Sequence, residues 1–201
     1  QNTIWRWVLV SQIPVPGAET AGSERIQMKS SKWIGWLAVL FHQDYESAIE
    51  LASGALGTLR EDQLHWRVVA LWAMAESQER TRSISEAIAT LWEALRTGQT
   101  LGNQVFVATV EISLALALNN NGQRRKAVKV CKEAIERYTD ASGRLSPISG
   151  LVLSRLAMLY YEANQLDLAR ECHDRGIALS EQVAPEYNLA FLQGLSAPIL
   201  Y

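Results

Sequence analysis

The side chains with the most reactive chemistry in this chain are three histidines and two cysteines. His42, His65 and His173 are far apart, and no carboxylate or cysteine stands at metal-ligand spacing from them. Cys172 is next to His173, but adjacent residues of a helix do not face each other. We therefore expect the histidines in core or surface roles. Cys131 and Cys172 are expected to be buried, inert thiols on the packed side of their helices.

The sequence also contains no motif for nucleotide binding and no membrane-spanning segment. No GxxxxGK[ST] loop is present to hold phosphates, and no apolar run reaches the roughly 18 residues of a membrane span. We predict no catalytic residue, no metal and no cofactor. The 201 residues are 48% hydrophobic with a formal net charge of -2, which argues against a general nucleic-acid or anionic-membrane surface. Two cysteines form no disulfide framework, so a reducing, cytoplasmic setting is expected.

One cluster of basic residues stands out against this near-neutral background. It consists of Arg124, Arg125, Lys126, Lys129 and Lys132, with Glu133 and Glu136 nearby. Such a cluster could contact nucleic acid or an acidic partner. The mixture of signs at helical spacing favours a solvated helix face.

The element that must position all these residues is a repeat. Four segments each place one small residue seven positions before another: Ala48 and Ala55, Ala87 and Ala94, Ala127 and Ala134, Ala169 and Gly176. The first members are 39, 40 and 42 positions apart. Twelve residues before them, the last three repeats have Ala75, Ala115 and Ala157. Small residues on two successive amphipathic stretches predict two helices that approach closely, which makes each repeat a helical hairpin.

Turn residues support this division. Gly122 and Asn164 each lie five residues before an anchor, where a left-handed helix cap suits glycine and asparagine. The equivalent residue of the second repeat is Arg82, so that turn is expected to be built differently. We predict first helices (helices A) at 31–42, 62–80, 103–120 and 147–163, and second helices (helices B) at 44–57, 84–99, 123–139 and 165–182.

The two ends of the chain differ from the repeats. Residues 1–30 combine a short apolar run with a Pro/Gly/Ser-rich stretch, and we interpret them as a remnant helix or strand and a connector. The segment after Ala184 begins like a further helix A, so the repeat domain is expected to span 31–201 with a partial fifth repeat. The chain starts at Gln1 and stops within a predicted helix, which suggests a piece of a longer protein.

The residues of the fourth repeat resemble a known signature. LeuSerArgLeuAlaMetLeuTyr at 153–160, followed by Ala169, resembles the tetratricopeptide (TPR) pattern of large, small and aromatic residues. The longer repeats, with GlyTrpLeuAla at 35–38 and AspTyrGluSerAla at 44–48, are similar to the MalT-like TPR region of LuxR-family, ATP-dependent bacterial transcriptional regulators. The resemblance implies an all-α, right-handed superhelix.

The resemblance also implies a function in binding. In this family the superhelix lies between a nucleotide-binding module and a helix-turn-helix domain, and it is thought to bind an inducer or a protein partner. The DNA-binding domain would then lie elsewhere in the parent protein, and this segment would contact neither nucleic acid nor membrane. A stand-alone protein-interaction scaffold and a regulatory appendage of a signalling enzyme remain alternatives. Because terminal repeats expose apolar ends, self-association is expected as well.

Helices A line the concave face of such a superhelix, where solenoids usually bind. The family's concave positions, carried over by register, are expected to bind a protein partner or a small-molecule effector. They are Val69, Trp72, Glu76, Glu79 and Arg80 in the second repeat, Thr109, Ile112, Leu116, Asn119 and Asn120 in the third, and Leu151, Ser154, Met158, Tyr161 and Glu162 in the fourth. Most of the seven tryptophans, all in the first half, are expected to pack between repeats.

Overall fold

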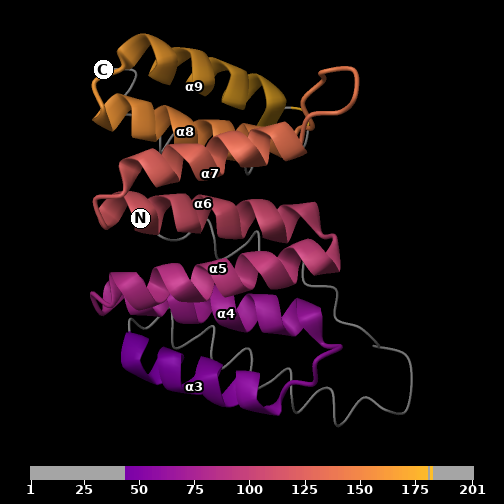
Figure 1. Cartoon of the computed structure of the whole chain (residues 1–201), viewed down its shortest axis with the longest axis vertical. Helices are drawn as coiled ribbons and strands as arrows, with labels where there is room; N and C mark the ends of the chain where they lie inside the picture. Colours follow the sequence, from indigo (N-terminus) through magenta and orange to yellow (C-terminus); the bar gives the residue numbers. More distant parts are fainter. Residues whose placement is uncertain (1–43, 181, 183–201) are drawn as a thin grey trace.

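The computed structural model describes residues 44–180 and residue 182. Through this part of the chain seven α-helices lie side by side in chain order (Figure 1). They are α3 (Tyr45–Thr58), α4 (Leu64–Arg80), α5 (Ile84–Leu101), α6 (Gln104–Asn120), α7 (Arg124–Arg137), α8 (Ser149–Glu162) and α9 (Leu166–Ser180). Every end lies within two residues of its predicted position. The helix predicted at 31–42, segment 1–30 and the partial fifth repeat lie outside the described residues.

The helices pack as the predicted hairpins. Within each repeat α4 packs on α5, α6 on α7 and α8 on α9, and each hairpin packs on the next. The fold is therefore an all-α solenoid of antiparallel helical hairpins, as predicted from the repeat.

Small residues bring the helices of each hairpin together. The anchors Ala48, Ala87, Ala127 and Ala169 are fully buried. In the last hairpin a Cβ added at Gly176 would lie 3.1 Å from the carbonyl oxygen of Gly150 and 2.9 Å from Oγ of Ser154. The backbones of α8 and α9 thus approach closely, because larger side chains would hold the two axes apart.

The three turns inside the hairpins that the structure describes in full have the same geometry, which corrects one expectation. Gly122 and Asn164 have positive φ angles of 74° and 58°, as predicted, but Arg82 also adopts 65°. In each turn the next residue donates its N–H to the carbonyl five positions back; for Ser83 this carbonyl belongs to Gln78, at 2.8 Å. The expectation that this turn is built differently is wrong. These helix-ending hydrogen bonds offset the roughly 1–2 kcal/mol that a left-handed arginine costs.

The curvature follows from which helices touch. Along the stack α4 packs on α6 and α6 on α8, whereas no two of α3, α5, α7 and α9 pack together to that extent. Helices A are thus closer together than helices B. We call the side formed by α4, α6 and α8 the inner, concave face, and the side formed by the helices B the outer face.

Candidate functional site

Polar side chains of the inner face bond from one repeat to the next. Between α4 and α6, the indole Nε1 of Trp72 donates to Oγ of Ser113 at 3.0 Å. Ser113 in turn donates to Oε1 of Glu76 at 2.8 Å. Further along both helices, Asn120 donates through Nδ2 to Glu79 at 2.6 Å. Two rungs of hydrogen bonds therefore hold these two helices in register.

A second set of contacts joins α6 to α8. Asn119 donates through Nδ2 to Oε2 of Glu162 at 2.7 Å. Arg124, at the start of α7, donates through Nε to Oδ1 of Asn119 at 3.2 Å and lies 3.7 Å from the Glu162 carboxylate. The rungs thus run across three successive repeats, and a change in curvature must alter them.

On α8 stands an arginine of this face that was not among the residues predicted from the sequence. Nε of Arg155, on α8, is buried and has no hydrogen-bond partner. Its guanidinium belongs to none of the ion pairs found in the described residues. Loss of hydration lowers the pKa of Arg155, while more distant charges, including Glu76, Glu162 and Glu79, act in the opposite direction. Arg155 is thus a partly buried cation whose Nε lacks a hydrogen-bond partner and whose charge lacks an ion-pair partner.

Glu76 is its counterpart on α4. Burial raises the pKa of the Glu76 carboxyl, and the hydrogen bond from Ser113 opposes that shift. Glu76 and Arg155 influence each other electrostatically, yet they do not form an ion pair. The inner face therefore holds two opposite charges without an ion-pair partner, one of which, Glu76, accepts a hydrogen bond from Ser113.

The fifteen predicted residues fall into three groups. Hydrogen bonds link six of them across repeats: Trp72, Glu76, Glu79, Asn119, Asn120 and Glu162. Five more keep some exposure without such a bond: Arg80, Leu116, Leu151, Met158 and Tyr161. Four are buried in the helix packing and offer no surface: Val69, Thr109, Ile112 and Ser154.

The buried four are left out of the candidate site for a physical reason. Ser154 donates its hydroxyl to the carbonyl of Gly150 at 3.0 Å and lies at the close approach of α8 and α9. Its neighbour Arg155 occupies the inner face instead. Arg155 follows Ser113 by 42 positions, which is the spacing between the last two anchors, so the repeat itself would have identified it.

The described histidines and Cys131 lie as expected, whereas Cys172 is less buried than expected. His65 is half-buried against the rings of Trp66 and Phe106, and burial lowers its pKa. His173 is buried, and His42 lies outside the described residues. Cys131 is buried with a pKa raised to about 12, and Cys172 is half-buried with a raised pKa, both because of lost hydration. A buried thiol with a raised pKa is a poor nucleophile.

Two further properties of the described residues bear on chemistry. No group of three or more His, Cys, Asp or Glu side chains gathers there in a way that could hold a metal ion. None of the seven helices has the length and apolar character needed to cross a membrane.

All five residues of the basic cluster are exposed. This exposure agrees with the prediction that the cluster is a solvated helix face.

Known proteins share both the sequence pattern and the fold. The family described as the MalT-like TPR region matches residues 36–198. No curated protein matches the chain. Among solved structures, BtubC (BKLC) from P. vanneervenii superposes with a TM-score of 0.65 at 17% identity, covering 100% of this chain and 87% of that one.

Two other structures show the same architecture. The apo form of RapI gives a TM-score of 0.64 at 13% identity, over 83% of this chain and 46% of that one. A putative kinesin light chain from Podosopora anserina, with nearly identical TPR-like repeats, gives 0.58 at 18% identity, over 84% and 85%. At these identities the likeness concerns the fold alone. Together with the family match over most of the chain, the repeated hairpins show that this chain belongs to the MalT-like TPR family.

Proposed function

We propose that this domain binds a polar effector across the inner face and thereby acts as the sensor of a LuxR-type bacterial transcriptional regulator. The function is binding without catalysis. The observation that carries it is a pair of opposite charges that form no ion pair, Glu76 on α4 and Arg155 on α8, beside polar groups that are bonded across repeats.

The chemistry of these two groups defines the ligand. A buried Nε without a hydrogen-bond partner on a partly buried guanidinium is unfavourable, because its lost hydration is replaced only by charges that form no ion pair with it. A carboxylate or phosphate of a ligand would supply charge-assisted hydrogen bonds to Arg155. Glu76 would accept a hydrogen bond from an ammonium, amide or hydroxyl group. We therefore infer a small polar ligand, or a peptide, that carries both an anionic and a donor group.

Ligand binding would be coupled to shape. A ligand that bridges α4 and α8 spans α6, so its affinity depends on the spacing of three successive helices A. It would favour the curvature in which both contacts form, at the expense of other curvatures. In the parent regulator this preference would shift the balance between an autoinhibited and an assembled state. The DNA-binding domain, in this proposal, is a separate cytoplasmic module.

The test is a binding screen with matched variants. Amino acids, dicarboxylates, sugar phosphates and short peptides are titrated calorimetrically into the chain and its variants. For a ligand of this site, Arg155→Met and Asn119→Ala are expected to weaken binding. Loss of the charge-assisted contact to Arg155 should lower the affinity roughly tenfold or more. Arg170→Met, which removes an exposed arginine of α9, is the control and should leave the affinity unchanged.

Two results would count against the proposal. If Arg155→Met binds every ligand as the unaltered chain does, the inner-face charges are not the binding site. If none of these compounds binds, while one protein is recovered in stoichiometric amount from the parent organism, a scaffold is the better account.

A further inference from the structure

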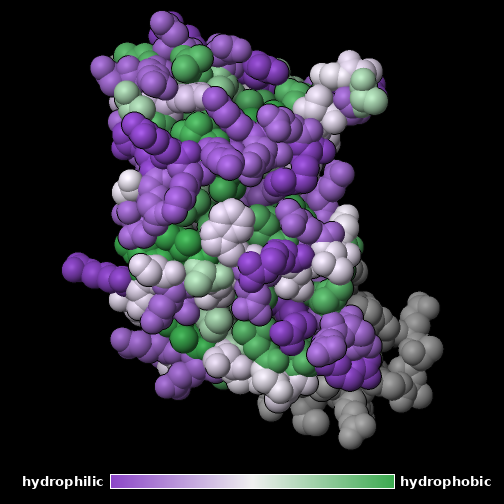
Figure 2. All heavy atoms as spheres, in the orientation of Figure 1, coloured by the Kyte–Doolittle hydropathy of each residue, from purple (hydrophilic) through white to green (hydrophobic). Residues whose placement is uncertain are grey.

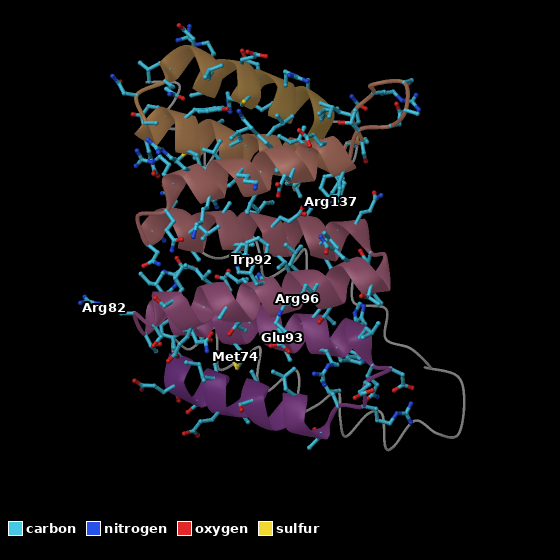
Figure 3. The ribbon with its side chains drawn as sticks, in the orientation of Figure 1. Met74, Arg82, Trp92, Glu93, Arg96 and Arg137 are labelled. Atoms are coloured by element: carbon cyan, nitrogen blue, oxygen red, sulfur yellow. The ribbon has the colours of Figure 1, made fainter. Side chains whose placement is uncertain are left out.

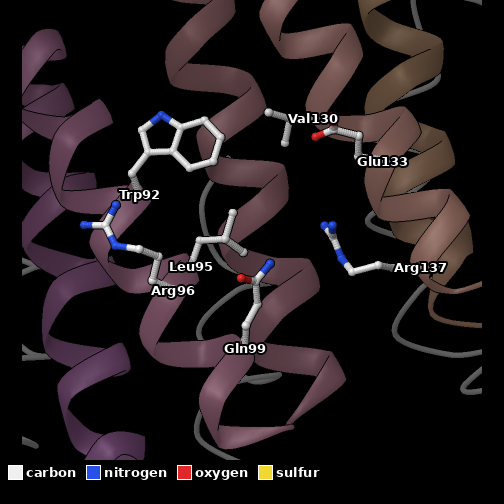
Figure 4. Close-up of a pocket in the computed structure, with 7 residues that line it drawn as sticks. All are labelled: Trp92, Leu95, Arg96, Gln99, Val130, Glu133 and Arg137. Atoms are coloured by element: carbon white, nitrogen blue, oxygen red, sulfur yellow. The ribbon is translucent and has the colours of Figure 1, made fainter.

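The outer face carries a second feature, a small cavity between α5 and α7 that is separate from the inner face. Its volume is about 150 Å³. Figure 4 shows Trp92 and Gln99 pointing toward it from α5, and Glu133 and Arg137 from α7. Arg96 also lines it from α5, with its guanidinium turned outward. Leu95 and Val130 are buried and supply apolar walls. The volume is below the 300 Å³ or so at which small-molecule sites begin, so the cavity suits one inserted side chain.

Trp92 provides exposed apolar surface next to this cavity. Its side chain is 38% exposed, which makes it one of the few large hydrophobic residues on the surface of the described chain. The other two tryptophans of the described residues are half-buried. An indole next to a small hollow offers apolar contact area to a partner, and tryptophan is among the residues that contribute most at protein interfaces.

Arg137 is held in place at the edge of the cavity by a buried acid. Its Nη2 contacts Oε1 of Glu111, whose side chain is fully buried in α6, while the arginine side chain is 43% exposed. The Tyr138 hydroxyl donates to the other oxygen of Glu111 at 2.9 Å. The guanidinium is thus fixed through one nitrogen, and its remaining N–H groups are available. A pre-oriented arginine loses little conformational freedom when it binds a carboxylate.

The surroundings of the cavity are positive. Arg96 belongs to no ion pair of the described residues; it lines the α5 side of the cavity, and its guanidinium is turned away from Arg137 (Figures 3 and 4). The basic cluster singled out in the sequence continues this charge along α7, where Lys129 neutralises Glu133 at 3.6 Å. Figure 2 shows hydrophilic side chains gathered over α7 and hydrophobic ones in the strip between α5 and α7. An apolar hollow bordered by cations is complementary to an acidic partner.

We propose that this cavity is a docking site for an acidic protein segment that inserts one aromatic or long aliphatic side chain beside Trp92. Aspartate or glutamate side chains of the segment bind Arg96 and Arg137. Nucleic acid fits less well. Its phosphates call for a continuous track of cations, whereas Glu133 lies at the cavity and Glu93 and Glu136 lie on the same two helices.

The test uses the whole chain and short labelled peptides of one design. The probe is a run of aspartate and glutamate with one central phenylalanine; its comparison peptides carry serine at the centre, or lysine in place of the acids. Fluorescence anisotropy at low salt should show saturable binding of the acidic phenylalanine peptide alone. Arg96→Glu and Trp92→Ser should each weaken it roughly tenfold, as expected when an interface loses a central residue.

Controls separate this site from general charge attraction and from the inner face. Arg170→Glu makes the same charge change on α9 and should bind the peptide as the unaltered chain does. Arg155→Met should also bind the peptide normally. The two proposals are therefore tested separately, because a negative result for the outer cavity leaves the inner-face proposal untouched. Circular dichroism melts show whether Arg96→Glu, an exposed substitution, and Trp92→Ser remain folded.

Three results would overturn the proposal. They are no saturable binding of the acidic phenylalanine peptide, equal binding of the serine peptide, or equal losses in Arg96→Glu and Arg170→Glu. Tighter binding of a single-stranded oligonucleotide than of the peptide, with sensitivity to Arg96→Glu, would overturn it in favour of nucleic acid.

Discussion

The inner and outer faces are built from the same hairpins but use their polar residues differently. On the inner face, hydrogen bonds run from one repeat to the next, and two opposite charges remain unpaired. On the outer face, Lys129 with Glu133 and Arg175 with Glu171 pair within single helices. The exception is Arg137, which reaches the buried Glu111 of the neighbouring helix.

This difference separates two kinds of binding. Bonds between repeats change when the stack bends, so a ligand of the inner face can bias curvature. Bonds within one helix do not depend on curvature, so a partner that contacts a single helix of the outer face meets the same contacts at every curvature. The cavity between α5 and α7 joins two repeats, and its shape depends on how neighbouring hairpins pack. Four substitution experiments can test this contrast, and their expected effects decrease from the first to the last.

The largest contrast is expected between two tryptophans. Trp72, on the inner face, is packed against the core and donates to Ser113, whereas Trp92 is exposed on the outer face. Trp72→Ala should lower the free energy of unfolding by about 3 kcal/mol, because it removes buried area and leaves a cavity. Trp92→Ala should lower it by about 0.5 kcal/mol, as is usual for surface substitutions. Urea unfolding followed by circular dichroism measures both.

Trp72→Phe serves as the matched control, since it keeps most of the packing and loses the hydrogen bond. Its loss in free energy of unfolding should lie between the losses of Trp72→Ala and Trp92→Ala. Equal losses in Trp72→Ala and Trp92→Ala would contradict the assignment of Trp72 to a structural contact between repeats.

The second contrast concerns two arginines. Arg137→Ala leaves the fully buried Glu111 with only Tyr138 as partner, and we expect a loss of about 2 kcal/mol. Arg124→Ala breaks an exposed contact with Glu162 and should cost about 0.5 kcal/mol. Burial raises the pKa of Glu111 and the contact with Arg137 opposes this shift. The loss in Arg137→Ala should therefore shrink in acid, where Glu111 is protonated, and urea unfolding at several pH values would reveal it.

A matched control for this prediction is the double variant Arg137→Ala with Glu111→Gln. If the unpaired carboxylate causes the loss, the second change should restore part of the stability. A double variant less stable than Arg137→Ala would show that Glu111 contributes in another way.

The third prediction concerns pH and the inner face. The folded-state pKa of Glu76 is raised above its unfolded value by burial, so between these two values the folded state binds more protons than the unfolded state. Stability from this group is thus greatest below the unfolded pKa and falls as pH rises through the folded pKa. Glu76→Gln should flatten this decline and stabilise the chain by about 1 kcal/mol at neutral pH.

Ser113→Ala is the companion measurement. The Ser113 hydrogen bond lowers the pKa of Glu76, so its removal should extend the decline to higher pH. If the free energy of unfolding of Glu76→Gln equals that of the unaltered chain at every pH, burial of this carboxyl does not make the stability depend on pH.

The sequence predicted the architecture well because the repeat determines it. Amphipathic spacing and small residues placed every helix end of the described chain within two residues. The left-handed turns at Gly122 and Asn164 were predicted from residue type, and that same reasoning failed at Arg82, where hydrogen bonds of the turn outweigh intrinsic preference.

The surfaces were harder to predict, because exposure depends on helix rotation. A rotation of one position along α8 exchanges the buried Ser154 for Arg155, and the periodic pattern does not resolve so small a change. The outer cavity joins Trp92 to Arg137, which belong to different repeats. Their meeting depends on how neighbouring hairpins pack, which a pattern within one repeat does not contain.

The smallest expected effect concerns a rung of the inner face itself. Asn120 is exposed and donates to Glu79 at 2.6 Å, so water can replace this bond when it is lost. Asn120→Ala should therefore lower the free energy of unfolding by only about 0.5 kcal/mol. If the rungs control curvature, the same variant should nevertheless change the radius of gyration measured by small-angle X-ray scattering, and Lys132→Ala on the outer face should not. A variant that matches Lys132→Ala in both stability and shape would mean that packing of α4 on α6 sets the curvature without help from this bond.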